Sequence, residues 1–329
     1  MKNKKIILSL DKIIINQKEI LIEKLNNIFS EAKYFYGSEK QKKDVTIYEK
    51  ILKELNRKKY LKRHTDVLLK KQNLKYHNKI LKNFLDIDYV LMIGGIYYSK
   101  EFIELVKEKN SKIKFILFLW DKFDRNKIKE LKNIYDIVYT FEKSDAAENH
   151  INWRPSFYVD EKKDLIKDID LYFLGENRDR ERYEYINRLY NFCMENGLRK
   201  NIKLFSRKKL KNVNPDIITY KRIPYEENLN NIQKTRVTFE KNIENQYGLS
   251  LRSLECLGYE TKLITTNKDI KTYDFYNSEN IYVIENVNDI DKIPINFFKE
   301  KYKKVDNEIL KRYSFEGFID EIFKNVDEE

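Results

Sequence analysis

Residues 246–281 read QYGLSLRSLECLGYETKLITTNKDIKTYDFYNSENI, and this stretch decides the fold that we expect. Its pattern predicts a loop, a short helix opened by Gly248 and Leu249 and ended by Gly258, and then a buried strand over residues 262–265. The first half of the chain likewise alternates apolar strands with helical stretches. That alternation is typical of a doubly wound parallel sheet.

The predicted short helix carries two charged residues, Arg252 and Glu255, three positions apart. The start of a helix has unpaired N–H groups and about half a positive charge, so it attracts anions. A carboxylate further along can accept hydrogen bonds from a pair of sugar hydroxyls. The segment could therefore hold a nucleotide-sugar, with the diphosphate at the helix start and the ribose at Glu255. The alternative is a surface helix whose Arg252 and Glu255 face water.

The same segment resembles the donor-binding half of bacterial GT-B glycosyltransferases, especially those that build lipopolysaccharide or capsule. Their phrase Gln-x-Gly-Leu-x-x-Arg-x-x-Glu-x-Leu-Gly is followed by a strand ending Ile-Thr-Thr-Asn and then by Tyr-Asp-Phe-Tyr. The matching residues here are Gln246, Gly248, Leu249, Arg252, Glu255, Leu257, Gly258, Ile264, Thr265, Thr266, Asn267, Tyr273, Asp274, Phe275 and Tyr276. Many retaining members have a second Glu eight positions earlier, where this chain has Tyr247, so the retaining mechanism is not carried over.

The resemblance implies an α/β fold with two Rossmann-like parallel-sheet domains that face a cleft. We expect an acceptor domain over residues 1–158 and a nucleotide-sugar domain over residues 168–305. A C-terminal helix over residues 306–329 is expected to pack back toward the first domain. The length of 329 residues also favours two domains over one.

Hydrophobic periodicity predicts particular helices within this scheme. One covers residues 20–32, and a basic helical stretch covers residues 47–84 with a break near residues 64–66. Two more are predicted over residues 289–298 and 307–323.

Further donor-site candidates follow the predicted strands of the second half. Gly175 follows the strand predicted over residues 169–174 and would let a phosphate come close to the backbone, with Arg178 three residues later. Lys268 follows the strand end at Asn267, and Tyr273 could stack on a base or a sugar. An ordinary turn at Gly175 and a loop packed by Tyr273 are the alternatives. The predicted donor site consists of Gly175, Arg178, Gln246, Gly248, Leu249, Arg252, Glu255, Asn267, Lys268 and Tyr273.

An inverting reaction needs a carboxylate or His to deprotonate the acceptor hydroxyl. Asp121 is the first candidate because it follows the clearest central strand, residues 113–120. A helix cap or a loop-bracing Asp is the alternative reading of this residue. The other candidates are Asp11, Glu142, Asp145 and His150.

The sequence gives little support for a metal or a cofactor. Asp-x-Asp pairs occur at Asp86/Asp88, Asp168/Asp170 and Asp289/Asp291, but each lies at a predicted strand or helix start, where Asp is common. Cys193 and Cys256 are the only cysteines, too few for a disulfide framework or a zinc set. There is no Walker loop, no Gly-x-Ser-x-Gly elbow and no Gly-x-Gly-x-x-Gly fingerprint. The resemblance implies a metal-independent enzyme that uses the nucleotide-sugar as substrate and has no cofactor.

The positive charge is concentrated at the start of the chain. Residues 1–80 hold 21 Lys/Arg and 9 Asp/Glu, which gives +12, so the remaining residues sum to zero. A basic surface could meet anionic lipid or nucleic acid. Because no nucleic-acid motif is present, we expect no nucleic acid. Without a signal peptide or a spanning apolar run, we expect a cytoplasmic protein, with peripheral binding to the inner face of the cell membrane left open.

These observations predict a glycosyltransferase that moves a sugar from a nucleotide-sugar donor to a glycan or lipid-linked glycan in lipopolysaccharide or capsule synthesis. The alternatives left open are a basic nucleic-acid-binding protein, a GT-B-like scaffold without catalysis, and a nucleotide-sugar epimerase on the same fold.

Overall fold

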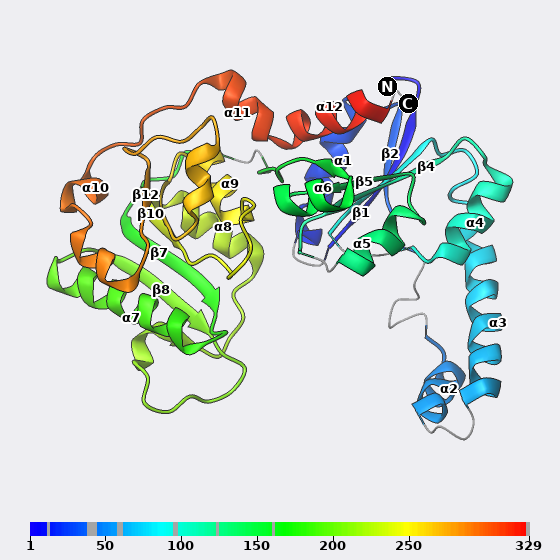
Figure 1. Cartoon of the computed structure of the whole chain (residues 1–329), viewed down its shortest axis with the longest axis horizontal. Coiled ribbons are helices and arrows are strands. Elements are labelled where there is room, and N and C mark those ends of the chain that lie inside the picture. Colours follow the sequence, from blue (N-terminus) through cyan, green and yellow to red (C-terminus); the bar gives the residue numbers. More distant parts are fainter. Residues whose placement is uncertain are drawn as a thin grey trace. The chain divides into compact units, whose positions relative to one another are not determined.

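The structure is a computed structural model that describes residues 1–11, 14–37, 45–57, 62–94, 98–122, 125–159 and 162–326 (Figure 1). Contacts within the chain divide it into two compact units. The first comprises Met1–Thr140 and Asp145–Asn152, and the second comprises Phe141–Ser144 and Trp153–Glu329.

The sheet of the first unit has, within the described residues, six strands in the order β2-β1-β3-β4-β5-β6. Each neighbouring pair along β2-β1-β3-β4-β5 is parallel. Strands β1, β3 and β4 are buried runs of Ile, Leu, Val, Met and Phe, the composition of parallel strands covered on both faces. The strands are β1 Lys5–Leu10, β2 Glu31–Tyr34, β3 Tyr89–Ile93, β4 Lys114–Leu119, β5 Ile137–Thr140 and β6 Asn152–Trp153.

Helices follow these strands, as the alternation in the sequence predicts. Ser99 caps α4, because its hydroxyl oxygen accepts the N–H of Phe102 at 3.3 Å. The helices are α1 Lys18–Asn26, α2 Ile47–Arg57, α3 Lys62–Leu81, α4 Lys100–Lys109, α5 Arg125–Lys132 and α6 Lys143–Asn149, with a 3₁₀ turn η1 at Ile15–Gln17.

Two helix predictions in this unit are wrong in detail. The helix predicted over residues 20–32 ends at Asn26, and the chain then enters β2. The side-chain oxygen of Asn26 accepts the N–H of Ala32 at 2.7 Å, and β2 pairs with β1, so sheet pairing outweighs helix propensity here. The predicted break near residues 64–66 is also absent, because α3 is continuous from Lys62 to Leu81.

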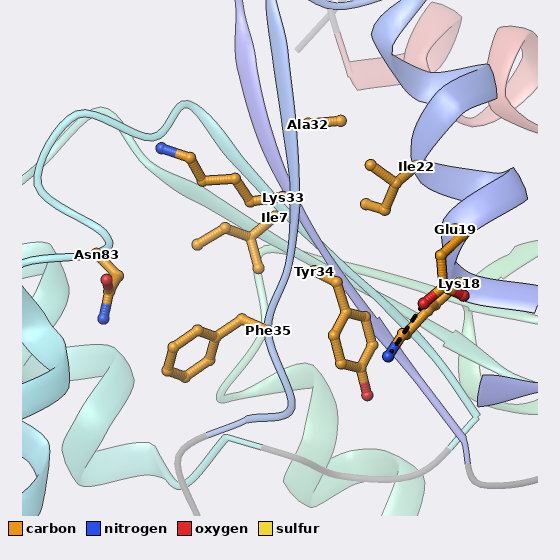
Figure 2. A pocket seen from close by; sticks show the side chains of 9 residues that line it. All are labelled: Ile7, Lys18, Glu19, Ile22, Ala32, Lys33, Tyr34, Phe35 and Asn83. Atoms are coloured by element: carbon orange, nitrogen blue, oxygen red, sulfur yellow. Dashed lines mark ion pairs between the residues drawn. The ribbon is translucent and has the colours of Figure 1, made fainter. Parts of the chain in front are cut away.

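A hollow of about 400 Å³ lies beside the edge strand β2 (Figure 2). The ring of Tyr34 points into it, and Lys18 Nζ lies 5.7 Å from the centre of that ring. Burial raises the pKa of Tyr34 to about 12. The lining residues are Ile7, Lys18, Glu19, Ile22, Ala32, Lys33, Tyr34, Phe35 and Asn83.

The sheet of the second unit has, in the part of the chain that is described, six strands in the order β12-β11-β10-β7-β8-β9, and every neighbouring pair is parallel. Two parallel α/β sheets therefore confirm the predicted fold class. That the two domains face a cleft stays a prediction. The strands are β7 Ile169–Glu176, β8 Lys200–Phe205, β9 Ile218–Thr219, β10 Thr235–Glu240, β11 Lys262–Thr265 and β12 Ile281–Val283.

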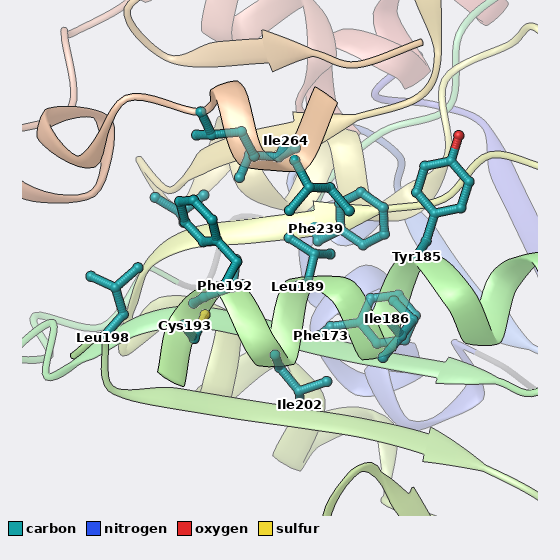
Figure 3. Close-up of a cluster of buried hydrophobic side chains, with 14 of the residues drawn as sticks. Phe173, Tyr185, Ile186, Leu189, Phe192, Cys193, Leu198, Ile202, Phe239 and Ile264 are labelled. Carbon is teal, nitrogen blue, oxygen red and sulfur yellow. The ribbon is translucent and has the colours of Figure 1, made fainter. Parts of the chain in front are cut away.

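The core of this sheet is packed by aromatic and aliphatic side chains (Figure 3). Leu189 and Phe192 of α7 lie against Phe173 of β7 and Phe239 of β10 in one cluster. Cys193 and Cys256 are both buried, Cys193 within the same core. The helices are α7 Arg180–Glu195, α8 Tyr225–Gln233, α9 Leu251–Gly258 and α10 Ile295–Lys299, with 3₁₀ turns η4 Pro215–Ile217, η5 Lys268–Thr272 and η6 Val287–Lys292.

The C-terminal helices differ from their predictions. The helix predicted over residues 289–298 is divided into η6 and α10 around Pro294, which cannot donate a helical hydrogen bond. The helix predicted over 307–323 is divided at Ser314 into α11 Asn307–Tyr313 and α12 Phe315–Val326. The hydroxyl oxygen of Ser314 accepts the N–H of Gly317 at 3.2 Å.

Helix α12 packs on residues of its own unit. The ring of Phe157 lies 4.9 Å from that of Phe315 and 4.7 Å from that of Phe318, between centres. That this C-terminal segment packs toward the first domain stays a prediction. Across the described residues, no helix is long and apolar enough to cross a membrane.

Candidate anion and sugar site of the second unit

The carboxyl ends of β7 and β10 bring charged loops together in the second unit. The two strands are neighbours in a parallel sheet, so the loops that follow them emerge at the same edge. The loop after β7 leads to α7, and the loop after β10 leads to α9. We call Arg178, Arg182 and Arg252, which these two segments contribute, the arginine cluster.

Arg252 joins the two strand ends. Its Nη2 donates to the carbonyl oxygen of Leu174 at 2.6 Å, and its Nη1 donates to that of Phe239 at 3.3 Å. Among the described residues, no hydrogen-bond acceptor meets its buried Nε. A guanidinium has five N–H donors, so Arg252 can brace the sheet and still donate to a ligand.

Arg182 is held in the same way on α7. Its Nη2 donates to the carbonyl oxygen of Lys241 at 3.1 Å, and its buried Nε meets no acceptor among the residues described. Burial is the main cause that lowers the pKa of Arg182, and the charges of Arg178 and Arg252 lower it further. Such a concentration of positive charge at a sheet edge would be stabilised by a bound anion.

Carboxylates of the unit compensate part of this charge. Asp179 and Glu240 both raise the pKa of Arg182. Glu240, the last residue of β10, is buried and accepts hydrogen bonds from Ser253 Oγ at 2.8 Å and Thr265 Oγ1 at 3.0 Å. These bonds fix its carboxylate between β10, β11 and α9.

Arg178 is exposed, two residues beyond the end of β7, and Gly175 is the penultimate residue of that strand. The need for glycine at 175 comes from packing, because a Cβ there would lie 2.6 Å from Cζ of Phe173. Gly175 and Arg178 thus lie at the end of β7, and Arg252 of α9 donates to carbonyl oxygens near the ends of β7 and β10; phosphate binding by these residues stays a prediction.

Glu255, the predicted ribose ligand, is 5% exposed. The hydroxyl of Tyr225 donates to its Oε1 at 2.5 Å. Burial raises the pKa of Glu255, although the bond from Tyr225 and the charge of Arg252 oppose this rise. In this conformation the carboxylate thus has an internal partner, and its contact with ribose stays a prediction.

The backbone N–H groups of Tyr247 and Gly248 have an internal partner as well. Both donate to Oε1 of Glu142 at 2.9 Å, and the Glu142 side chain is fully buried. Gly248 is required because a Cβ would lie 2.5 Å from Cδ2 of Phe141 and 2.7 Å from the Phe141 carbonyl oxygen. Of the two residues whose N–H groups we expected to face a diphosphate, Gly248 and Leu249, the first therefore donates to a carboxylate of the protein itself.

The helix also begins later than predicted. Helix α9 starts at Leu251 with Ser250 as its cap, so Gly248 and Leu249 precede it. Leu249 is buried in the core. The prediction that these two residues open the helix is therefore wrong, because the Ser250 hydroxyl oxygen accepts the Ser253 N–H and sets the start.

Two other predicted donor residues order the loop before α9. The amide nitrogen of Asn267 donates to the carbonyl oxygens of Tyr247 and Gly248 at 3.1 and 3.4 Å. The backbone oxygen of Gln246 accepts a hydrogen bond from the amide nitrogen of Asn242. These contacts hold residues 246–248 in one conformation.

Lys268 and Tyr273 lie after β11. Lys268 is exposed and pairs with Glu285 at 3.3 Å. Tyr273 lines a hollow of about 290 Å³ together with Glu142, Lys143, Ser144, Tyr247, Gly248, Asp269 and Thr272. Lys143 Nζ lies 4.7 Å from the centre of the Tyr273 ring and 5.0 Å from that of Trp153. Gly248 and Tyr273 are thus brought together, but Arg178, Arg252 and Glu255 do not line this hollow.

Candidates for the catalytic base have different surroundings. Asp121 is exposed, two residues beyond β4 of the first unit, and its role stays a prediction. Burial raises the pKa of Asp145. Glu142 is buried and accepts hydrogen bonds from backbone N–H groups, so in this conformation its carboxylate is not open to an acceptor.

Several site residues are not predicted by the sequence. Arg182 is one of several charged residues at the start of α7, and Glu240 is one carboxylate at a strand end. Tyr225 carries no signal at all, because only the fold brings it to Glu255, thirty positions later.

No protein-family model and no curated protein sequence matches this chain. Among solved structures, the chain is similar to the crystal structure of CalG4, the calicheamicin glycosyltransferase, with 9% identity, 95% of this chain and 93% of that chain covered, and a TM-score of 0.40. It is also similar to the glycosyltransferase of kitacinnamycin, with 9% identity, 98% and 99% coverage and a TM-score of 0.40. Because both TM-scores are low, the fold assignment depends on the strand order described above.

Proposed function

We propose that this protein is a glycosyltransferase that binds a nucleotide-sugar on its second unit and transfers the sugar to a glycan. The observation that carries the proposal is the arginine cluster at the carboxyl ends of β7 and β10. The resemblance of residues 246–276 to the donor-binding segments of GT-B glycosyltransferases also favours donor binding in this part of the second unit.

The chemistry of such a transfer fits this arrangement. Displacement at the anomeric carbon leaves negative charge on the departing nucleoside diphosphate. Arginine side chains stabilise that charge through ionic hydrogen bonds, which are the strong ones in proteins. Fixed donors that face a developing charge are commonly the largest contribution to catalysis.

The finer parts of the proposal come from the sequence. The acceptor would be a growing lipopolysaccharide or capsule glycan, free or lipid-linked, bound by the first unit, where Asp121 would act as base. The hollow beside Tyr34 lies in that unit, and substitutions of the residues that line it would test whether the acceptor binds there. The reaction would need no metal and no cofactor, and the protein would act in the cytoplasm, at the inner face of the cell membrane.

Calorimetric titration of the full chain with nucleoside diphosphates and a panel of nucleotide-sugars tests donor binding. Arg178→Gln and Arg182→Gln should each weaken affinity about 10- to 100-fold, the effect of losing a hydrogen bond to a charged group. Arg188→Gln is the matched control, because Arg188 lies on the same helix as Arg182 but pairs with Asp291 and Glu195.

The control should bind like the wild type. Arg178 is the cleaner variant, since its side chain is exposed and its loss should leave the melting temperature unchanged. Unchanged affinity in both cluster variants, with folded protein, would remove the donor site from these strand ends.

A further inference from the structure

Helix α2 leaves most of its apolar face uncovered. Ile47 and Ile51 lie one turn apart and are 76% and 52% exposed, with Tyr48 beside them at 49%. Leu52, on the edge of the same apolar face, is buried. Helices α2 and α3 contact each other and lie side by side (Figure 1), and we call this pair the hairpin.

Helix α3 has an outward face of mixed character. Val67 and Leu74 are seven residues apart, on the same side of the helix, and they are 62% and 54% exposed. Lys70, Lys71 and Lys75 are exposed around them. The opposite side of α3 carries Ile80 into the core of the first unit. Aliphatic side chains and ammonium groups therefore alternate on one exposed surface.

The hairpin holds half of the net charge of the protein. Residues 47–57 and 62–81 contain 9 Lys/Arg and 3 Asp/Glu, so their net charge is +6 of the total of +12. Aliphatic groups next to long basic side chains are the pattern of elements that lie in a membrane interface, with the ammonium groups at the lipid phosphates and the apolar groups below them.

We propose that the hairpin docks the protein on an anionic lipid bilayer. Ile47 and Ile51 of α2 and Val67 and Leu74 of α3 enter the boundary between headgroups and acyl chains. Lys70, Lys71 and Lys75 contact the anionic headgroups. The proposal depends on exposure and charge within the first unit, so it stands independently of sugar transfer.

Two other partners fit this surface less well. Single-stranded nucleic acid is bound by aromatic side chains that stack on bases, whereas the exposed apolar side chains among the described residues of the hairpin are aliphatic except Tyr48. The centre of a protein–protein interface is depleted in charge and especially in lysine, yet Lys70 and Lys71 separate Val67 from Leu74. The combination of exposed aliphatic side chains with lysines therefore favours anionic lipid.

Co-sedimentation of the full chain with vesicles tests the proposal. One set of vesicles is phosphatidylcholine alone, and the other contains about a third phosphatidylglycerol. We expect binding to the anionic vesicles only, weakening as salt is added. Each lysine near an anionic surface contributes roughly fivefold in affinity, so the triple variant Lys70→Gln, Lys71→Gln, Lys75→Gln should bind on the order of 100-fold more weakly.

The apolar contribution has its own variant and control. The double variant Ile47→Ser, Ile51→Ser should bind about 10-fold or more weakly, because exposed isoleucines no longer enter the bilayer. Ile166→Ser, which changes an exposed isoleucine of the second unit, should leave binding unchanged. The charge control is Lys208→Gln, Lys209→Gln, Lys211→Gln, which removes three exposed lysines outside the hairpin.

Several results would overturn the proposal. One is equal binding to both vesicle types, and another is equal loss in the hairpin and control variants. Tighter binding to an oligonucleotide than to anionic vesicles would assign the surface to nucleic acid. A dimer in sedimentation equilibrium that Ile47→Ser, Ile51→Ser dissociates, without any vesicle binding, would assign it to a second copy of the chain. Circular dichroism shows whether each variant remains folded.

Discussion

Replacing Glu142 with alanine should destabilise the second unit by about 2–6 kcal/mol. The buried carboxylate accepts the N–H groups of Tyr247 and Gly248, both at 2.9 Å from Oε1. Alanine leaves two backbone donors without this acceptor, and each buried donor that loses its partner costs about 1–3 kcal/mol. Glu142→Gln keeps an oxygen at this position, so it should cost only about 1 kcal/mol.

Urea unfolding followed by tryptophan fluorescence measures this difference. The chain has two tryptophans, and a Trp120→Phe background leaves Trp153 as the only reporter. Its Nε1 donates to the carbonyl oxygen of Phe141 at 3.1 Å, so it is sensitive to the segment that carries Glu142. The free energy of unfolding is obtained from the midpoint and slope of that transition.

Glu244→Ala is the matched control, because Glu244 is an exposed carboxylate in the loop that also contains Tyr247. Its substitution should change the free energy by less than about 0.5 kcal/mol. If Glu142→Ala unfolded at the same urea concentration as the wild type, the assigned role of the carboxylate would be wrong. Pyrophosphate should raise the midpoint of the Glu142→Ala variant more than that of the wild type, because the N–H groups that Glu142 no longer engages add a second place where an anion can bind.

Three further predictions concern other residues. Burial lowers the pKa of Lys167 from 10.5 to about 8, so between these two pH values the unfolded chain binds more protons than the folded chain. In urea titrations the free energy of unfolding of the wild type should therefore rise over this pH range by up to about 3 kcal/mol relative to that of Lys167→Met. Equal pH slopes would contradict this burial. Gly258→Ala should cost about 1–3 kcal/mol in the same assay, since its Cβ would overlap the ring of Tyr158; a neutral result would mean that the ring moves freely. Asp121→Asn should abolish sugar transfer and leave donor affinity unchanged, and near-normal turnover would exclude Asp121 as the base.

Much of the fold is predictable because burial on both faces leaves a strong pattern. The apolar run of β4 and the cap at Ser99 are read correctly from local residues alone. The failures are at element ends, where pairing partners compete with helix propensity. Ala32 is a good helix former, yet it lies in β2 because β1 offers it a backbone partner.

The candidate site is predictable only in part. Spacing brings Arg252 and Glu255 onto one short helix, and the strand end brings Gly175 and Arg178 to the sheet edge. Spacing does not show what each side chain meets. Arg252 donates to two strand carbonyl oxygens, and Glu255 accepts from Tyr225. These partners come from distant parts of the chain.

The sequence by itself determined the alternation of strands and helices, since hydrophobic periodicity and caps are local properties. It also determined where the positive charge is concentrated. Only the tertiary structure decided that Glu142 accepts hydrogen bonds from the N–H groups of Tyr247 and Gly248, more than a hundred residues away in sequence. A hydrogen bond depends on the position and direction of both groups in space, and those are set by packing.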